Sequence, residues 1–219
     1  MTYIKICGIK NEDDALETVK AGADFIGLMF ATSPRQVTTA QAVRVTAALK
    51  EKGARIGCVG VFVNEKIPTV RKIVDTCHLD WVQLSGDESW EYCAELARPF
   101  IKAIRLNSSE PAESVKQQIN KGEKIAGGQK HLIHLDTMVQ DRYGGTGRTF
   151  DWNLAKPIAE RFPVIIAGGL NPGNVGRAIK LIKPWGVDVS TGVETKGAKD
   201  MKKITKFIEA VREADASQT

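Results

Sequence analysis

Two reactive side chains, each at the end of an apolar run, offer the clearest acid–base chemistry. Cys7 ends the run YIKIC, and Asp136 ends the run HLIHLD. A free cysteine is usually an inert buried group, but strand alternation would place Lys5 on the same side as Cys7, and an ammonium group favours the thiolate. Asp136 either caps the following loop or faces a polar opening, because burial of a carboxylate is costly. A thiolate base and a carboxylic acid at one edge of a sheet would form a proton-transfer pair.

Glycine-rich segments follow three later apolar runs: YGGTG (143–147), AGGLN (167–171) and STGVE (190–194). Glycine permits positive φ and lets the backbone approach a ligand closely. Successive backbone N–H groups in such turns bind anions. One such segment alone would be an ordinary turn, but two after neighbouring strands predict a phosphate site.

Two further polar residues have a structural and a functional interpretation. Arg35 is either an exposed arginine or a bidentate contact for a carboxylate. His134 lies two residues before Asp136, on the same side and one layer deeper, and is interpreted as a packed core histidine. The four cysteines form no C-x-x-C pair and have no histidine at zinc-finger spacing, so we expect no metal site and a reducing, cytoplasmic environment.

The composition indicates a single globular domain spanning residues 1–219. The chain has 219 residues, of which 42% are hydrophobic, and this suffices for one large core. No apolar run approaches the roughly 20 residues of a membrane span, and no secretory signal pattern opens the chain. The net charge of +5 is scattered along the sequence, whereas nucleic-acid binders usually concentrate theirs in a stripe.

The elements that must position these residues repeat one unit, a short β-branched run followed by an amphipathic stretch. Eight such units in so short a chain predict a (β/α)8 TIM barrel, whose active site lies at the carboxyl ends of the strands. A doubly wound sheet is the structural alternative, but the first run is not followed by G-x-G-x-x-G. We expect strands at 3–7, 24–30, 55–63, 80–84, 100–106, 131–136, 163–168 and 187–190.

The segments between these runs predict helices. Asn11 would cap the first, and Gly22 would follow its end. Residues 120–130, NKGEKIAGGQK, are expected to form a flexible turn before the sixth strand, and residues 214–219 are expected to fray.

The chain resembles the phosphoribosylanthranilate isomerase family of tryptophan biosynthesis, a branch of aromatic amino-acid biosynthesis. The resemblance extends over nearly the whole sequence, and the combination of KICG, GGTG before FDW, and VDVSTGVE is specific. The matching segments are KICGIKNEDDA (5–15), GADFIGLMF with SPRQV (22–37), GVFVNE (60–65), VQLSGDE (82–88), LDTMVQDRYGGTGRTFDW (135–152), AGGLNPGNV (167–175) and VDVSTGVETKGAKD (187–200).

The resemblance implies a cofactor-free Amadori rearrangement of N-(5-phosphoribosyl)anthranilate, a small phosphorylated substrate. Cys7 matches the family's general base and Asp136 its general acid. Arg35 matches its contact to the anthranilate carboxylate. Its phosphate-binding loops correspond to Gly145, Thr146 and Gly147, then to Gly168 and Gly169, then to Ser190, Thr191 and Gly192.

One departure and three alternatives accompany this interpretation. Ser85 stands in VQLSG where the family often has histidine, which puts a histidine role near the fourth strand in doubt. A related barrel isomerase of the histidine-pathway aminoaldose would have aspartate at position 7 and a second half repeating the first. A non-catalytic phosphate-binding barrel need not keep both Cys7 and Asp136, and a nucleic-acid-binding protein would show a basic patch. No nucleic acid or membrane partner is expected, and a monomer and a homodimer both remain open.

Overall fold

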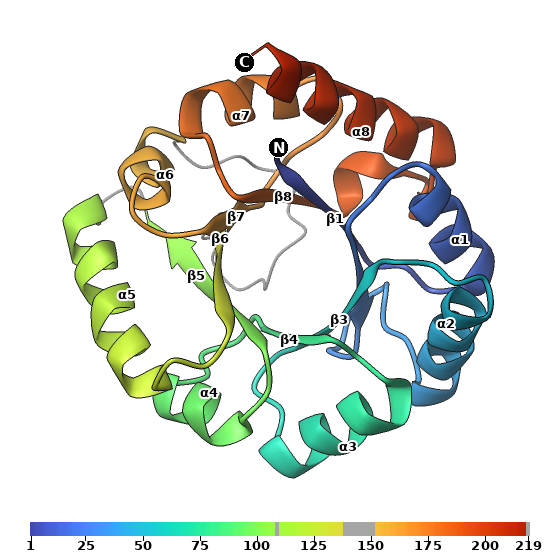
Figure 1. Cartoon of the computed structure of the whole chain (residues 1–219), viewed down its shortest axis with the longest axis horizontal. Helices are drawn as coiled ribbons and strands as arrows, with labels where there is room; N and C mark the ends of the chain where they lie inside the picture. Colours follow the sequence, from blue (N-terminus) through green and yellow to red (C-terminus); the bar gives the residue numbers. More distant parts are fainter. Residues whose placement is uncertain (108–109, 138–151, 218–219) are drawn as a thin grey trace.

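The barrel is formed by parallel strands that follow one another in sequence order. The computed structural model describes residues 1–107, 110–137 and 152–217. In this part of the chain, eight strands pair in the order β1 to β8, and β8 closes the barrel on β1, as the TIM-barrel prediction requires (Figure 1). They are β1 (Tyr3–Cys7), β2 (Phe25–Met29), β3 (Gly57–Phe62), β4 (Trp81–Leu84), β5 (Phe100–Leu106), β6 (His131–Thr137), β7 (Val164–Ile166) and β8 (Gly186–Val189).

The helices form a ring around these strands (Figure 1). The side chain of Asn11 accepts a hydrogen bond from the Asp14 N–H at 2.8 Å, and Gly22 follows the first helix with a φ of +98°, so both predicted ends are confirmed. The helices are α1 (Glu12–Lys20), α2 (Thr39–Glu51), α3 (Ile67–Cys77), α4 (Trp90–Leu96), α5 (Ala112–Ala126), α6 (Trp152–Ala159), α7 (Val175–Ile182) and α8 (Met201–Ala216).

Two predicted irregular segments prove to be helical. The prediction of a turn at 120–130 is wrong for residues up to Ala126, which belong to α5. Ile119, Gly122 and Ala126 continue the buried face of this helix. The helix ends before Gly127, whose φ is +62°. The prediction that the chain frays from residue 214 is wrong for residues up to Ala216. These residues form the last turn of α8, which the buried Ala214 anchors.

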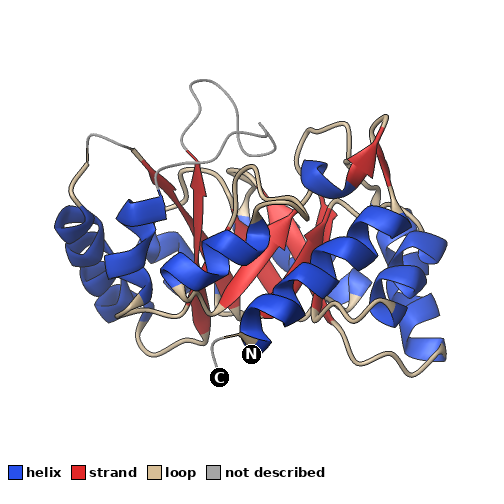
Figure 2. Cartoon of the chain, turned by 90° about the horizontal axis from the view of Figure 1, so that it is seen from above, coloured by secondary structure: helices blue, strands red, loops and turns tan. Residues whose placement is uncertain are grey.

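A small hairpin that the sequence pattern did not predict follows β8. A 3-10 turn (Thr191–Val193) leads into β9 (Glu194–Thr195), which pairs antiparallel with β10 (Ala198–Lys199). Figure 2 shows the hairpin at one end of the barrel, with the amino terminus at the opposite end. It therefore lies over the carboxyl ends of the strands, where this architecture positions its active site.

Side chains of alternating strand positions fill the barrel interior. Its amino-terminal half holds an apolar cluster, against which Phe25 and Trp185 pack. The larger core lies between the strands and the helices. In the part of the chain that the structure describes, no helix is both long and apolar enough to cross a membrane. The interior cluster comprises Val59, Trp81, Ile101, Leu132 and Ile165.

Candidate active site

Cys7 is the last residue of β1, and its side chain is 6% exposed. Gly27 of the neighbouring β2 provides room for it, since a Cβ atom on Gly27 would lie 2.7 Å from the Cys7 Sγ atom. Burial raises the pKa of the Cys7 thiol, and the Lys5 ammonium opposes this increase. The predicted proximity of Lys5 and Cys7 is therefore present in the folded chain.

A buried ion cluster lies one layer beneath Cys7. The Lys5 Nζ atom donates to Asp188 Oδ2 at 2.7 Å, and the His134 Nε2 atom lies 2.9 Å from the same oxygen. Burial alone would raise the pKa of Asp188, but Lys5 and His134 outweigh it and lower the pKa to about 2. His134 is a buried core residue as predicted, whereas its acidic partner was missed, although an aspartate within the apolar run VDV is a visible signal.

Asp136 lies on the interior side of β6, two residues beyond His134. Its side chain is half-buried, and in register it pairs with Arg105 of β5. Both candidate catalytic residues thus lie at carboxyl ends of strands and on the interior side. Of the predicted phosphate-binding residues, Gly145, Thr146 and Gly147 lie outside the described residues.

Arg35 binds a carboxylate of its own chain. Its Nε and Nη2 atoms donate to the two oxygens of Glu194 at 2.6 and 2.8 Å, and Lys199 Nζ donates to Glu194 Oε1 at 2.8 Å. Burial alone would raise the pKa of Glu194, but the bonds from Arg35 and Lys199 outweigh it and lower the pKa to about 2. Arg35 is therefore paired within the chain, and its predicted contact to a substrate carboxylate stays a prediction. Glu194 and Lys199 were not among the predicted site residues.

The two glycine loops after β7 and β8 pack directly against each other. Gly168 and Gly169 have φ values of +83° and +65°, where a side chain would be strained. A Cβ atom on Gly192 would lie 1.9 Å from the Leu170 carbonyl oxygen, so only glycine permits this approach. Ser190 lies at the start of the same turn. The described members of the predicted phosphate site are therefore brought together.

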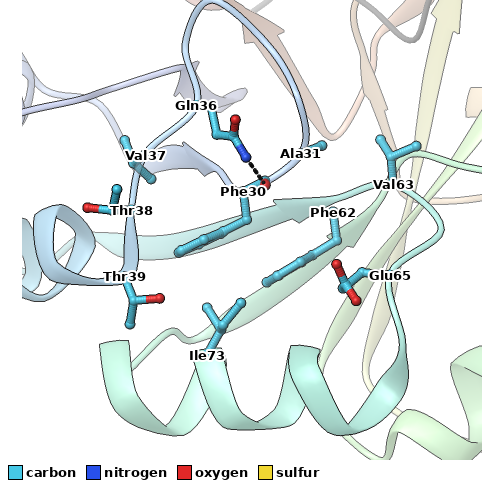
Figure 3. Close-up of a pocket in the computed structure, with 10 residues that line it drawn as sticks. All are labelled: Phe30, Ala31, Gln36, Val37, Thr38, Thr39, Phe62, Val63, Glu65 and Ile73. Carbon is cyan, nitrogen blue, oxygen red and sulfur yellow. Dashed lines mark hydrogen bonds between the residues drawn. The ribbon is translucent and has the colours of Figure 1, made fainter.

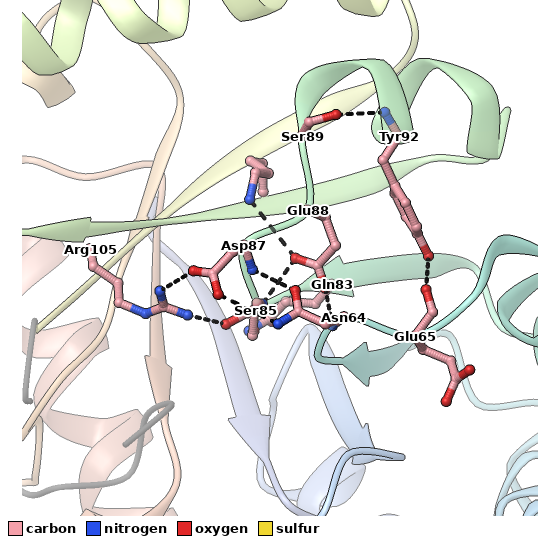
Figure 4. Close-up of polar contacts among 11 residues, drawn as sticks. Asn64, Glu65, Gln83, Ser85, Asp87, Glu88, Ser89, Tyr92 and Arg105 are labelled. Atoms are coloured by element: carbon pink, nitrogen blue, oxygen red, sulfur yellow. Dashed lines mark hydrogen bonds and ion pairs between the residues drawn. The ribbon is translucent and has the colours of Figure 1, made fainter. Parts of the chain in front are cut away.

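The loop after β4 contains Ser85, the departure from the family pattern. Figure 4 shows it at the centre of a polar network. The Gln83 side chain donates to the Ser85 hydroxyl at 3.0 Å, and Arg105 donates to the Ser85 carbonyl at 2.6 Å and to Asp87 at 3.0 Å. These bonds hold the Arg105 side chain of β5 against the loop after β4.

A hollow of about 520 Å³ lies elsewhere, on the outer side of β2 and β3 (Figure 3). The rings of Phe30 and Phe62 stack there with centroids 5.1 Å apart, facing Ile73 of α3. None of its lining residues is a predicted site residue. Among the described residues, no group of three or more His, Cys, Asp or Glu side chains is placed to hold a metal ion.

The comparisons with known proteins agree with one another. The sequence pattern of the family described as N-(5'phosphoribosyl)anthranilate (PRA) isomerase matches residues 4–210. The chain is 45% identical over 218 residues to the N-(5'-phosphoribosyl)anthranilate isomerase of Dehalococcoides mccartyi, with 100% of this chain and 99% of that relative covered.

Two solved structures resemble the whole barrel. One contains monomers of dimeric phosphoribosylanthranilate isomerase from Thermotoga maritima, at 34% identity and a TM-score of 0.81, with 97% of this chain and 100% of that chain covered. The other is a phosphoribosylanthranilate isomerase in complex with reduced 1-(o-carboxyphenylamino)-1-deoxyribulose 5-phosphate, at 35% identity and a TM-score of 0.80, with the same coverage of 97% and 100%.

Proposed function

This chain belongs to the N-(5'-phosphoribosyl)anthranilate isomerase family, and we propose that Cys7 is its general base and Asp136 its general acid. The chain is an enzyme of tryptophan biosynthesis that isomerises N-(5'-phosphoribosyl)anthranilate. The proposed reaction is an Amadori rearrangement that yields 1-(2-carboxyphenylamino)-1-deoxyribulose 5-phosphate.

Two proton transfers account for the rearrangement. Asp136 protonates the furanose ring oxygen, and the ring opens to a Schiff base. Cys7 then removes the proton from C2′, which gives an enolamine that tautomerises to the ketone. Each positioned proton transfer typically contributes about 10²–10⁴-fold to the rate.

The order of the strands is the observation that most directly supports the roles of Cys7 and Asp136. In the closed barrel, β6 and β1 flank β7 and β8. The glycine loops after β7 and β8 therefore lie between the strand that ends in Cys7 and the strand that carries Asp136. A substrate phosphate held by Gly168, Gly169 and the loop of Gly192 would place the sugar carbons between base and acid, and such positioning contributes as much as the proton transfers.

Arg35 and the remaining loop residues complete the proposed substrate site. Arg35 would bind the anthranilate carboxylate through guanidinium N–H groups that do not bond Glu194, while Glu194 holds Arg35 beside the turn after β8. Ser190 and Thr191 would add phosphate contacts from the turn after β8. Gly145, Thr146 and Gly147 are proposed for the phosphate on the family resemblance alone.

We also propose that residues 1–219 fold as one domain that acts in the cytoplasm without a cofactor. A monomer and a homodimer both remain compatible with the chain. The solved relative from Thermotoga maritima consists of monomers generated from a dimeric phosphoribosylanthranilate isomerase, and this supports the homodimer, which sedimentation would test.

The reaction is tested with freshly prepared phosphoribosylanthranilate, by following the loss of its anthranilate fluorescence. We expect the fluorescence to fall rapidly with the parent enzyme. With Cys7→Ser and with Asp136→Asn we expect kcat to fall by about 10²–10⁴-fold, since each substitution removes one proton-transfer group. A folded Cys7→Ser or Asp136→Asn enzyme with near-parental kcat would reject that residue's role. A folded parent without activity would reject the substrate, and the histidine-pathway aminoaldose would be tested next.

A further inference from the structure

A polar layer crosses the barrel interior directly beneath the strand-end residues. Lys5, Gln83, His134 and Asp188 each lie two positions before a strand-end side chain, and all are at most 6% exposed. The layer beneath them is the apolar cluster of the amino-terminal half. A hydrophobic interior of similar volume would usually be at least as stable as buried charges, so this layer has no evident stabilising purpose.

Lys5 is the central charge of this layer. It is 1% exposed and pairs in register with Asp188 across the β1–β8 junction, with 2.7 Å between Nζ and Oδ2. His134 contacts the same carboxylate oxygen at 2.9 Å. The other oxygen, Asp188 Oδ1, is buried and accepts no hydrogen bond from the residues that the structure describes. The Lys5 ammonium thus gives one of its protons to Asp188 and keeps two for other acceptors.

Gly27 shows where the rest of the Lys5 ammonium group points. The position that a Cβ atom on Gly27 would take lies 2.7 Å from Cys7 Sγ and 3.2 Å from Lys5 Nζ. The sulfur and the nitrogen therefore converge on one small space, which exists because Gly27 has no side chain. Lys5 faces a carboxylate on one side and the Cys7 thiol on the other.

We propose that Lys5 is a positioning residue, whose buried ammonium group is held by Asp188 and stabilises the thiolate of Cys7 for removal of the substrate proton. This inference rests on the proposed role of Cys7 as general base. Lys5 keeps its own proton throughout, and the C2′ proton ends on the Cys7 sulfur. His134 of β6 contacts the same Asp188 oxygen and so helps to hold this carboxylate in place.

Four charged groups act on the Cys7 thiol, and their signs make the inference specific. Lys5 from β1 and Lys199 from β10 lower its pKa, while Asp188 from β8 raises it; Arg35, from the loop after β2, is also close enough to interact with the thiolate. Loss of Lys5 should therefore raise the pKa of Cys7, and loss of the Asp188 charge should lower it. Removing the two members of one ion pair is therefore expected to shift the pKa of Cys7 in opposite directions. A merely structural role of the pair would not produce opposite shifts.

The test measures kcat/KM against pH, together with the rate at which iodoacetamide alkylates Cys7, read from the Cys7 peptide by mass spectrometry. For Lys5→Met we expect the ascending limb and the alkylation profile to move up by at least one pH unit, with kcat/KM at pH 7 at least tenfold lower. For Asp188→Asn we expect both profiles to move to lower pH. Gly27→Ala keeps both charges but separates them, and should shift the profiles upward.

Lys102→Met is the matched control. Lys102 is also a buried lysine, on β5, but it faces outward toward Glu88 at 3.9 Å. Its removal should leave both pH profiles unchanged whatever it does to stability. The control therefore separates the loss of any buried lysine from the loss of the one beside Cys7.

Unchanged profiles in Lys5→Met, or shifts of Lys5→Met and Asp188→Asn in the same direction, would overturn the inference. If Lys5→Met does not fold, Asp188→Asn alone tests the proposal. pH profiles of that variant that are unshifted, or shifted to higher pH, would contradict it. If Cys7→Ser retains activity, the proposed function fails instead, and the alkylation profiles still decide whether Lys5 acts on the thiol.

Discussion

Replacing Gly192 with alanine should separate the two loops that form the proposed phosphate site. The added Cβ atom would lie 1.9 Å from the Leu170 carbonyl oxygen and 2.9 Å from its carbonyl carbon. Both are backbone atoms, so no side-chain rotation can relieve the contact. Cβ atoms essentially never approach within 3.0 Å, so the turn after β8 and the loop after β7 must part by about 1 Å.

The size of the effect follows from this displacement. A misplacement of about 1 Å in a positioning element can cost about 100-fold in rate, which corresponds to about 2.7 kcal/mol of transition-state stabilisation. We expect Gly192→Ala to lower kcat/KM about 100-fold, mainly through a higher KM. Backbone N–H groups, rather than side-chain charge, would be responsible, because the substitution removes no polar group.

The fluorescence assay measures this effect, with inorganic phosphate as a competitive probe of the phosphate site. Gly173→Ala is the matched control, since it lies just after the same loop and its Cβ would meet only the Asn171 side-chain oxygen, at 3.2 Å. We expect Gly173→Ala to stay within about threefold of the parent, and thermal unfolding should show both variants folded. A folded Gly192→Ala enzyme with parental KM and phosphate inhibition would refute the proposed site.

Further expectations concern substrate binding, acid stability and packing. Arg35→Lys keeps the charge but loses the bidentate fork, so KM should rise about tenfold or more, and an unchanged KM would remove Arg35 from the site. Because the pKa of Glu194 is lowered from 4.5 to about 2, its pairing stabilises the fold above pH 4.5 and is lost as the pH falls toward 2. Urea unfolding should therefore show a smaller loss of stability over that range in Glu194→Gln than in the parent, and equal losses would contradict the pairing. Gly122→Ala gains about 1 kcal/mol of helix propensity, but its Cβ would lie 1.9 Å from the Trp90 ring, and overpacking costs about 1–3 kcal/mol, so calorimetry should show a lower Tm. Gly176→Ala, whose nearest contact is 3.5 Å, should leave Tm unchanged or slightly higher, and equal Tm shifts in both variants would contradict the packing argument.

Local sequence patterns were sufficient to predict the strands and most helices. The strands at 3–7 and 100–106 have the predicted bounds. One error arose where glycine was interpreted as a chain breaker. Gly122 lies inside α5 because its missing side chain makes room for the Trp90 ring, and this tertiary reason is absent from the local pattern.

Long-range polar partners could not be predicted from the same patterns. Lys5 pairs with Asp188, and Arg35 with Glu194, across 183 and 159 residues of sequence. Strand alternation indicates which residues face the interior, but the register between β1 and β8 decides which of them meet. The hairpin of β9 and β10 adds Lys199 to Glu194, and its two-residue strands are too short to give a periodic signal.

The positions where the apolar pattern of the strands breaks are therefore the informative ones. Lys5 interrupts YIKIC, His134 interrupts HLIHLD, and Asp188 interrupts VDV, and each break would be a defect if the interior served stability alone. In the folded chain the three breaks meet at one carboxylate oxygen, one layer below Cys7 and Asp136. Removing one member would leave the others as uncompensated buried polar groups, so the cluster is constrained as a unit. Chance interruptions in three separate strands would not be expected to converge in this way, and their convergence beneath the proposed base supports a role in its chemistry.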